Sequence, residues 1–349
     1  MTPSQRSMLM SGSSVTPQYV AVSLNVTPFI TFYKRLGDKL NKLAAPATLP
    51  PSNTFLNNNI AVDNTGTYVA IASGTTPFVT VYKRTNDTFT KLTNPGTLPT
   101  HPCRSCQFSN TGLYLLVGAD DSTIVNTWVY TIAGTTVTYN NALSTGSASV
   151  DSYSFSPDDS LLFVGRNASD TNGACFETYS FNGTTFTLVS SFNVIGMGAG
   201  VDIPSVAISP DGNFAAAAGG GSPYIVFFSR SGTTLTKLTN PTTLPNARAY
   251  GVAWSPDSLY CAVGYSTSPY LIVYKNIGGV FTPLTVPVTA PTGTVTGLQY
   301  TADNQYLVIS TTATPYIGMY KHNGDTLTWD TTAPSALPVG QANGMVLFK

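Results

Sequence analysis

The stretch GVAWSPDSLYCAVGYSTSPYLIVYK, residues 251–275, contains short apolar runs separated by turn residues. With the segment that follows, it supplies four runs: GVAW (251–254), LYCAVGY (259–265), YLIVYK (270–275) and FTPLT (281–285). The runs are rich in aromatic and β-branched residues and are bounded by Gly, Pro, Asn and Asp, which favour turns. The stretch therefore predicts a unit of four short antiparallel strands.

This unit recurs along the chain. A large residue follows the first turn of each copy: Tyr19, Tyr68, Tyr114, Leu161, Phe214, Tyr260 and Tyr306. Successive members of this set are 46 to 53 residues apart, and a second aromatic residue follows 14 residues later in five copies. In the third and fourth copies that distance is 16 and 18 residues, to Tyr130 and Tyr179, which indicates insertions between the second and third strands.

A four-strand repeat of about 47 residues is typical of a β-propeller blade. We therefore predict an all-β fold, a seven-bladed β-propeller with four antiparallel strands per blade. The seven copies predict a single domain over residues 1–349, with residues 1–14 as an N-terminal extension.

The ring has to be closed by one of the chain ends. The C-terminal sequence ANGMVLFK matches AYGVAWSP (249–256), which contains a first strand, whereas the first copy matches reliably only from its second strand. We predict that residues 343–349 pair with the N-terminal blade and leave no open sheet edge. The alternative is that Ser7–Ser11 (SMLMS) supplies this strand.

Two recurring phrases carry a resemblance. SPDG (209–212) before an apolar strand, followed by Ser-Pro and an aromatic strand, resembles WD40-type propellers, and KLTNPxTLP (91–99 and 237–245) resembles the degenerate repeats of tailed-bacteriophage virion and tail proteins. The third strand ends in Tyr-Lys, as in Tyr274-Lys275, in place of Trp-Asp, and no Gly-His precedes the first strand. The buried Asp–His network of WD40 repeats is therefore absent, and apolar packing and backbone ladders are expected to hold the blades.

The charge of the chain excludes some partners. Charged residues make up 9% of the sequence, and 16 basic residues balance 16 acidic ones. A nucleic-acid-binding protein needs a basic face, so we expect no nucleic-acid partner. No run of 18 apolar residues is present, so we expect no membrane insertion.

The two faces of the predicted disc differ in charge. The first–second and third–fourth turns share one face, where mixed charges such as Lys34 and Asp87 predict an ordinary solvated surface. The opposite face is mostly uncharged, except in the two blades with insertions. These blades supply a candidate interaction surface: Arg104, Asp120, Asp121, Asp151, Arg166 and Asp170. The alternative is that these two blades have drifted without acquiring a function.

Reactive groups are scarce. His101, Cys103 and Cys106 are close in sequence, but the remaining Cys and His are isolated, so neither a zinc site nor a Cys103–Cys106 disulfide is favoured. Two His and one Glu supply few acid–base groups. We therefore predict no catalytic, metal-binding or cofactor-binding residues, and no enzyme activity.

The resemblance and this scarcity together predict a non-enzymatic structural or interaction propeller. The resemblance implies a phage virion component, such as a capsid decoration, collar or tail appendage, whose partners are other virion proteins or a host-surface receptor. The expected location is the virion, with a secreted or cytoplasmic soluble protein as the alternative. Two other functions stay open: a lactonase-like enzyme, and receptor or glycan binding through the aromatics Phe29, Phe78, Tyr224, Tyr270 and Tyr316.

Overall fold

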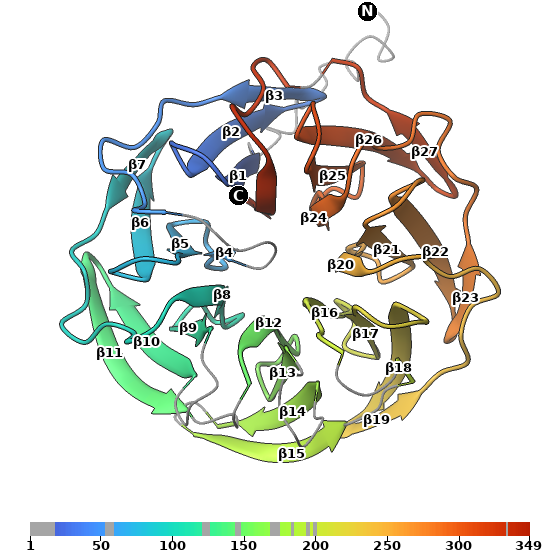
Figure 1. The fold of residues 1–349 in the computed structure, drawn as a ribbon, viewed down its shortest axis with the longest axis horizontal. Coiled ribbons are helices and arrows are strands. Elements are labelled where there is room, and N and C mark those ends of the chain that lie inside the picture. Colours follow the sequence, from blue (N-terminus) through green and yellow to red (C-terminus); the bar gives the residue numbers. More distant parts are fainter. Residues whose placement is uncertain are drawn as a thin grey trace, which may run out of the picture.

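All the regular secondary structure in the described part of the chain is β-strand. The computed structural model describes residues 18–52, 59–120, 126–143, 148–167, 175–182, 185–192, 196–197, 201–332 and 334–349. Seven four-stranded antiparallel sheets form a ring of blades around a central axis (Figure 1). This confirms the predicted seven-bladed propeller. No helix in these residues is long and apolar enough to span a membrane.

Consecutive blades follow one another around the ring in sequence order, and the four strands of each blade are named here from the central axis outward. Blade 1 consists of β28 (Ala342–Phe348), β1 (Gln18–Leu24), β2 (Ile30–Leu36) and β3 (Lys39–Lys42). Blade 2 consists of β4 (Ile60–Val62), β5 (Tyr68–Ala72), β6 (Val79–Thr85) and β7 (Thr88–Lys91). Blade 3 consists of β8 (Cys103–Phe108), β9 (Tyr114–Ala119), β10 (Thr127–Ala133) and β11 (Thr136–Leu143).

Blade 4 consists of β12 (Val150–Phe155), β13 (Leu161–Arg166), β14 (Phe176–Phe181) and β15 (Phe186–Phe192). Blade 5 consists of β16 (Ser205–Ile208), β17 (Phe214–Ala218), β18 (Ile225–Ser231) and β19 (Thr234–Lys237). Blade 6 consists of β20 (Ala249–Trp254), β21 (Tyr260–Tyr265), β22 (Leu271–Ile277) and β23 (Val280–Pro283). Blade 7 consists of β24 (Val295–Tyr300), β25 (Tyr306–Thr311), β26 (Ile317–Asn323) and β27 (Thr326–Trp329).

The C-terminal strand closes the ring. Strand β28 pairs antiparallel with β1, with Tyr19 opposite Phe348 and Val22 opposite Met345. The predicted closure is therefore confirmed, and the strand begins one residue earlier than expected. The alternative strand, Ser7–Ser11, and the predicted extension 1–14 lie outside the described residues.

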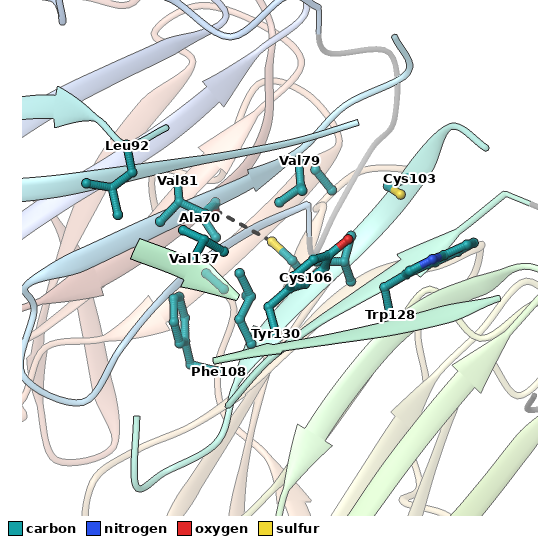
Figure 2. Packing of buried hydrophobic residues seen from close by; sticks show 14 of the residues in the cluster. Ala70, Val79, Val81, Leu92, Cys103, Cys106, Phe108, Trp128, Tyr130 and Val137 are labelled. Atoms are coloured by element: carbon teal, nitrogen blue, oxygen red, sulfur yellow. Dashed lines mark hydrogen bonds between the residues drawn. The ribbon is translucent and has the colours of Figure 1, made fainter. Parts of the chain in front are cut away.

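Apolar side chains fill the space between neighbouring blades. Figure 2 shows one such cluster between blades 2 and 3, where Val81 and Ala70 face Cys106 and Tyr130. Successive side chains along a strand point to opposite faces of its sheet, so each blade contributes side chains to the clusters on both of its sides.

Hydrogen bonds also join the blades, so the expectation of apolar packing and ladders alone is incomplete. In five blades, a fully buried tyrosine of the third strand donates its hydroxyl to a carbonyl of the linker arriving from the preceding blade, at 2.8–3.2 Å. The pairs are Tyr33–Ala336, Tyr82–Thr48, Tyr130–Thr97, Tyr274–Thr243 and Tyr320–Thr289. These bonds join blades in place of the Asp–His network.

Candidate functional site at one mouth of the propeller

In five blades the innermost strand contains a β-bulge near its start. There, one residue of this strand has no partner on the second strand. The register of β8 against β9, for example, places Cys103 opposite Ala119 and Ser105 opposite Gly118, which leaves Arg104 outside the ladder. The residues left out in this way are Arg104, Asp151, Tyr250, Thr296 and Asn343. A β-bulge turns a side chain away from its regular direction and is frequent beside active sites. Since all five stand at the same end of their strands, they surround one mouth of the ring, which we call the bulge mouth.

Glycine opposite the bulge permits this geometry. A Cβ atom on Gly118 would overlap Ser105 Oγ, and one on Gly165 would overlap Ser152 Oγ. Ser105 Oγ donates to the carbonyl of Val150 in the next blade at 2.8 Å. The glycine therefore leaves room for a side-chain bond that fixes the next bulged strand.

Arg104 joins two carboxylates across blades 3 and 4. Its Nε lies 2.7 Å from Asp120 Oδ1, and its Nη1 lies 3.4 Å from Asp151 Oδ1. Ser149 Oγ also donates to Asp120 Oδ1, at 2.9 Å. The first two bulged residues are thus an ion pair, and Asp120 at the end of β9 completes it.

A second arginine–aspartate pair joins blades 5 and 6. Arg248 donates to Asp202 through both terminal nitrogens, with Nη1 2.9 Å from Oδ1. The guanidinium lies over the ring of the bulged Tyr250, 4.9 Å from its centroid. A Cβ on Gly220 would overlap Asp202 Oδ1, so this glycine is needed for the carboxylate to reach the arginine.

Asp151, the partner of Arg104 in the first pair, is also affected by the charges of the second pair. Its side chain is 9% exposed, and its pKa is raised to about 7, chiefly by burial. The charges of Asp202 and Asp120 contribute to this rise, while Arg104 and Arg248 oppose it. A carboxyl group with this pKa can both accept and release a proton near neutral pH, which is the property of a general base.

A narrow cavity of about 50 Å³ adjoins the mouth, lined by Tyr250, Thr296 and other residues of the inner strands. A larger cavity, of about 450 Å³, opens at the opposite end, beside Asp63, Tyr300 and Phe348. Asp63 there accepts the backbone N–H of Tyr68 at 2.6 Å and so serves a turn. We locate the candidate chemistry at the bulge mouth, because that end holds the carboxylate able to exchange a proton.

The predicted interaction surface is only partly a surface. Arg104 and Asp120 are partly exposed, and with Asp151 they form the cluster described above. Arg166 is 1% exposed, and its Nη2 lies 2.6 Å from Glu177 Oε2. Its inclusion was therefore wrong: the guanidinium is held inside blade 4 by the one Glu of the chain. Asp121 and Asp170 lie outside the described residues.

The cysteines form no reactive site. All four are free and buried, and Cys106 Sγ lies 3.6 Å from the carbonyl oxygen of Ala70 (Figure 2). Burial raises the pKa of Cys106 to about 12 and that of Cys103 well above its ordinary value. Within the described ranges no three His, Cys, Asp or Glu side chains gather as metal ligands.

Sequence reasoning missed Asp202, Arg248 and Tyr250. A signal was available for Tyr250: Gly118, Gly165 and Gly264 stand at the same position of the second strand in three repeats, and glycine inside a strand suggests a bulge. No such signal marks Asp202 or Arg248. The five aromatic residues of the glycan hypothesis are half-buried, and four of them pack against core clusters: Phe78, Tyr224, Tyr270 and Tyr316.

Comparison with known proteins places the fold. The family model of the WD domain, G-beta repeat, matches residues 93–125. A search of curated protein sequences found no match. A candidate 6-phosphogluconolactonase from Bacteroides fragilis is 12% identical with a TM-score of 0.75, and the match covers 97% of this chain and 99% of that one. A second, from Bacteroides uniformis, is 14% identical with a TM-score of 0.74, covering 95% and 99%. A periplasmic gluconolactonase from Pseudomonas aeruginosa is 13% identical with a TM-score of 0.68, covering 96% and 99%.

These matches contradict two predictions: the non-enzymatic virion component and the absence of enzyme activity. Three of the propellers that match along nearly their whole length carry lactonase names. The prediction counted acid–base groups by residue type, and such a count leaves out the raised pKa of Asp151. The predicted partners and virion location stay predictions. The chain is a WD40-like seven-bladed β-propeller, similar in fold to propellers named as lactonases.

Proposed function

We propose that the protein hydrolyses the cyclic ester of a sugar acid at the bulge mouth. The observation that carries this proposal is Asp151, a nearly buried carboxylate with a pKa of about 7 that contacts Arg104 and interacts electrostatically with the Arg248–Asp202 pair. The lactonase names of three whole-length structural matches agree with this reaction class.

In the proposed reaction, ionised Asp151 accepts a proton from a water molecule whose oxygen attacks the carbonyl carbon of the lactone. The π electrons of the carbonyl move to its oxygen, and Arg104 and Arg248 supply the positive charge that stabilises this oxyanion. The C=O bond then re-forms and the bond to the ring oxygen breaks. The ring oxygen takes the proton from Asp151, so one water is consumed, an open hydroxy acid is formed and the carboxylate is regenerated.

The two arginines are positioned for this role by their partners. Asp120 holds Arg104 through Nε, which leaves a terminal nitrogen directed at Asp151. Asp202 and the Tyr250 ring hold Arg248 from two sides. Groups fixed before the reaction stabilise developing charge without reorganising, which supports catalysis by this cluster.

The test is an assay of glucono-δ-lactone hydrolysis. The rate is measured through proton release, and the spontaneous rate is subtracted. Asp151→Asn keeps the size of the side chain and removes the base, so we expect kcat/KM to fall by about 100-fold or more. Asp87→Asn, at an exposed ion pair with Lys34 on the opposite face, is the matched control and is expected to keep full activity. Rates equal to the buffer blank, or an Asp151→Asn variant as active as the wild type, would overturn the proposal.

A further inference from the structure

We infer that the bulge mouth takes a lactone without a phosphate or other anionic group. This inference rests on the proposed function, because it names the substrate class of the same site. The distinction matters, since the similar propellers include candidates named for a phosphorylated lactone and one named for gluconolactone.

The charges at the mouth are already balanced within the protein. The Arg104 guanidinium contacts Asp120 and Asp151, and that of Arg248 contacts both oxygens of Asp202. Three carboxyl groups therefore stand beside two guanidinium groups. An arriving phosphate would meet arginines that are already paired and carboxylates of its own sign.

The other lysines on this side belong to outer strands. Lys42, Lys91 and Lys237 end the outermost strands β3, β7 and β19, whose backbones lie three strand spacings, or about 14 Å, from the inner strands (Figure 1). The Lys237 ammonium lies beside Gly196, in the linker between blades 4 and 5. Arg166 is buried against Glu177. The inserted segments 121–125 and 168–174 contain Asp121 and Asp170 and no Lys or Arg.

Phosphate recognition in proteins uses arginine forks, lysines or clusters of backbone N–H groups, and like charges placed together oppose binding. A neutral polyhydroxy lactone has different needs. Its hydroxyl groups can donate to Asp120 and Asp202, its ester carbonyl can accept from the arginines, and its ring can lie beside the Tyr250 face. The paired charges of the mouth thus fit an uncharged, hydroxyl-rich ring.

The experiment compares kcat/KM for glucono-δ-lactone and 6-phosphoglucono-δ-lactone under the same conditions. We expect a preference of at least about tenfold for the uncharged lactone, because the carboxylates of the mouth repel the phosphate. Replacement of Asp120 by Asn removes one negative charge beside Arg104 and should reduce this preference. Asp87→Asn on the opposite face, the matched control, should leave it unchanged.

A binding measurement separates this inference from the proposed function. Glucono-δ-lactam and its 6-phosphate are analogues of the two lactones with an amide in place of the ester, and they differ only in the phosphate. Thermal shift measures their binding without turnover. If the phosphorylated lactone is hydrolysed as well as the neutral one, the inference is wrong and the proposed function holds. If neither lactone is hydrolysed but the uncharged lactam alone stabilises the protein, the proposed function is wrong and the inference holds. Equal stabilisation by both lactams, or by neither, would overturn the inference in that case.

Discussion

The hydroxyl of Tyr33 donates a hydrogen bond of 3.0 Å to the carbonyl oxygen of Ala336, across 303 positions of the chain. Tyr33 is buried in strand β2 of blade 1, and Ala336 lies in the linker that precedes the closing strand β28. Tyrosines of four other blades hold their incoming linkers in the same way. The bond therefore repeats, at the point of closure, an interaction that joins consecutive blades elsewhere.

The first prediction concerns this tyrosine position. Tyr274→Phe removes the hydroxyl that donates to the carbonyl oxygen of Thr243. Because this oxygen then lacks its partner, we expect the free energy of unfolding to fall by about 1 kcal/mol. Tyr270→Phe is the control, since within the described residues its hydroxyl has no hydrogen-bond partner. Urea denaturation measures both. Equal effects would mean that the linker bond contributes nothing.

The second prediction concerns closure. Removal of residues 342–349 deletes β28, exposes an edge of β1 and removes buried Leu347 and Phe348, each worth roughly 1.5–3 kcal/mol. We expect aggregation or a large fall in Tm by calorimetry. Removal of residues 1–14, the matched truncation, should leave Tm unchanged. The reverse result would assign the closing role to the N-terminal segment.

The third prediction concerns Gly220. In Gly220→Ala the new Cβ would overlap Asp202 Oδ1 and lie 3.4 Å from Arg248 Nη1, so the pair has to shift. Small displacements at a catalytic site have large effects, and we expect kcat/KM for the lactone to fall by about tenfold with little change in Tm. Gly96→Ala is the control, because its Cβ would have nothing within 4 Å. Full activity in Gly220→Ala would remove the Arg248–Asp202 pair from the mechanism.

The fourth prediction concerns pH. The pKa of Asp151 rises from 3.8 to about 7 on folding, so the folded state holds the proton more tightly than the unfolded state. Stability from this group is present below pH 4 and is lost as the pH rises to about 7. Each pKa unit corresponds to about 1.4 kcal/mol, so the loss is on the order of a few kcal/mol. Asp151→Asn cannot ionise, so its Tm should exceed that of the wild type at pH 8 and approach it at pH 5. A difference independent of pH would mean that Asp151 titrates normally.

The blades could be predicted because their signal is local and repeated. Each strand has its own aromatic and β-branched run, and the spacing of 46 residues from Tyr260 to Tyr306 recurs in two other pairs of neighbouring copies. The closing strand could be predicted because ANGMVLFK resembles another inner strand. The tyrosine–linker bonds could not, because a buried Tyr looks the same in sequence whether or not its hydroxyl reaches a carbonyl.

The site was harder to predict for two physical reasons. Arg104 and Asp151 are 47 positions apart, and Asp202 and Arg248 are 46 apart, so each pair joins adjacent blades at about one repeat length. The insertions in blades 3 and 4 also make the repeats harder to align with one another, so equivalent positions in adjacent blades are harder to recognise. The pKa of Asp151 depends on its burial and on charges from three other blades, which no single stretch of sequence contains.

The bulges also bear on how such a propeller can change over time. A residue left out of the ladder has no cross-strand partner, so its replacement leaves the pairing of its blade intact. Arg104, Asp151 and Tyr250 can therefore vary without disturbing the ladders, whereas the Oγ1 of Thr296 also donates to the carbonyl of Ala342 in the next blade. Five of the seven blades have such an extra residue, so the chemistry of the mouth can change over evolution, one side chain at a time, while the strand pairing around it stays the same.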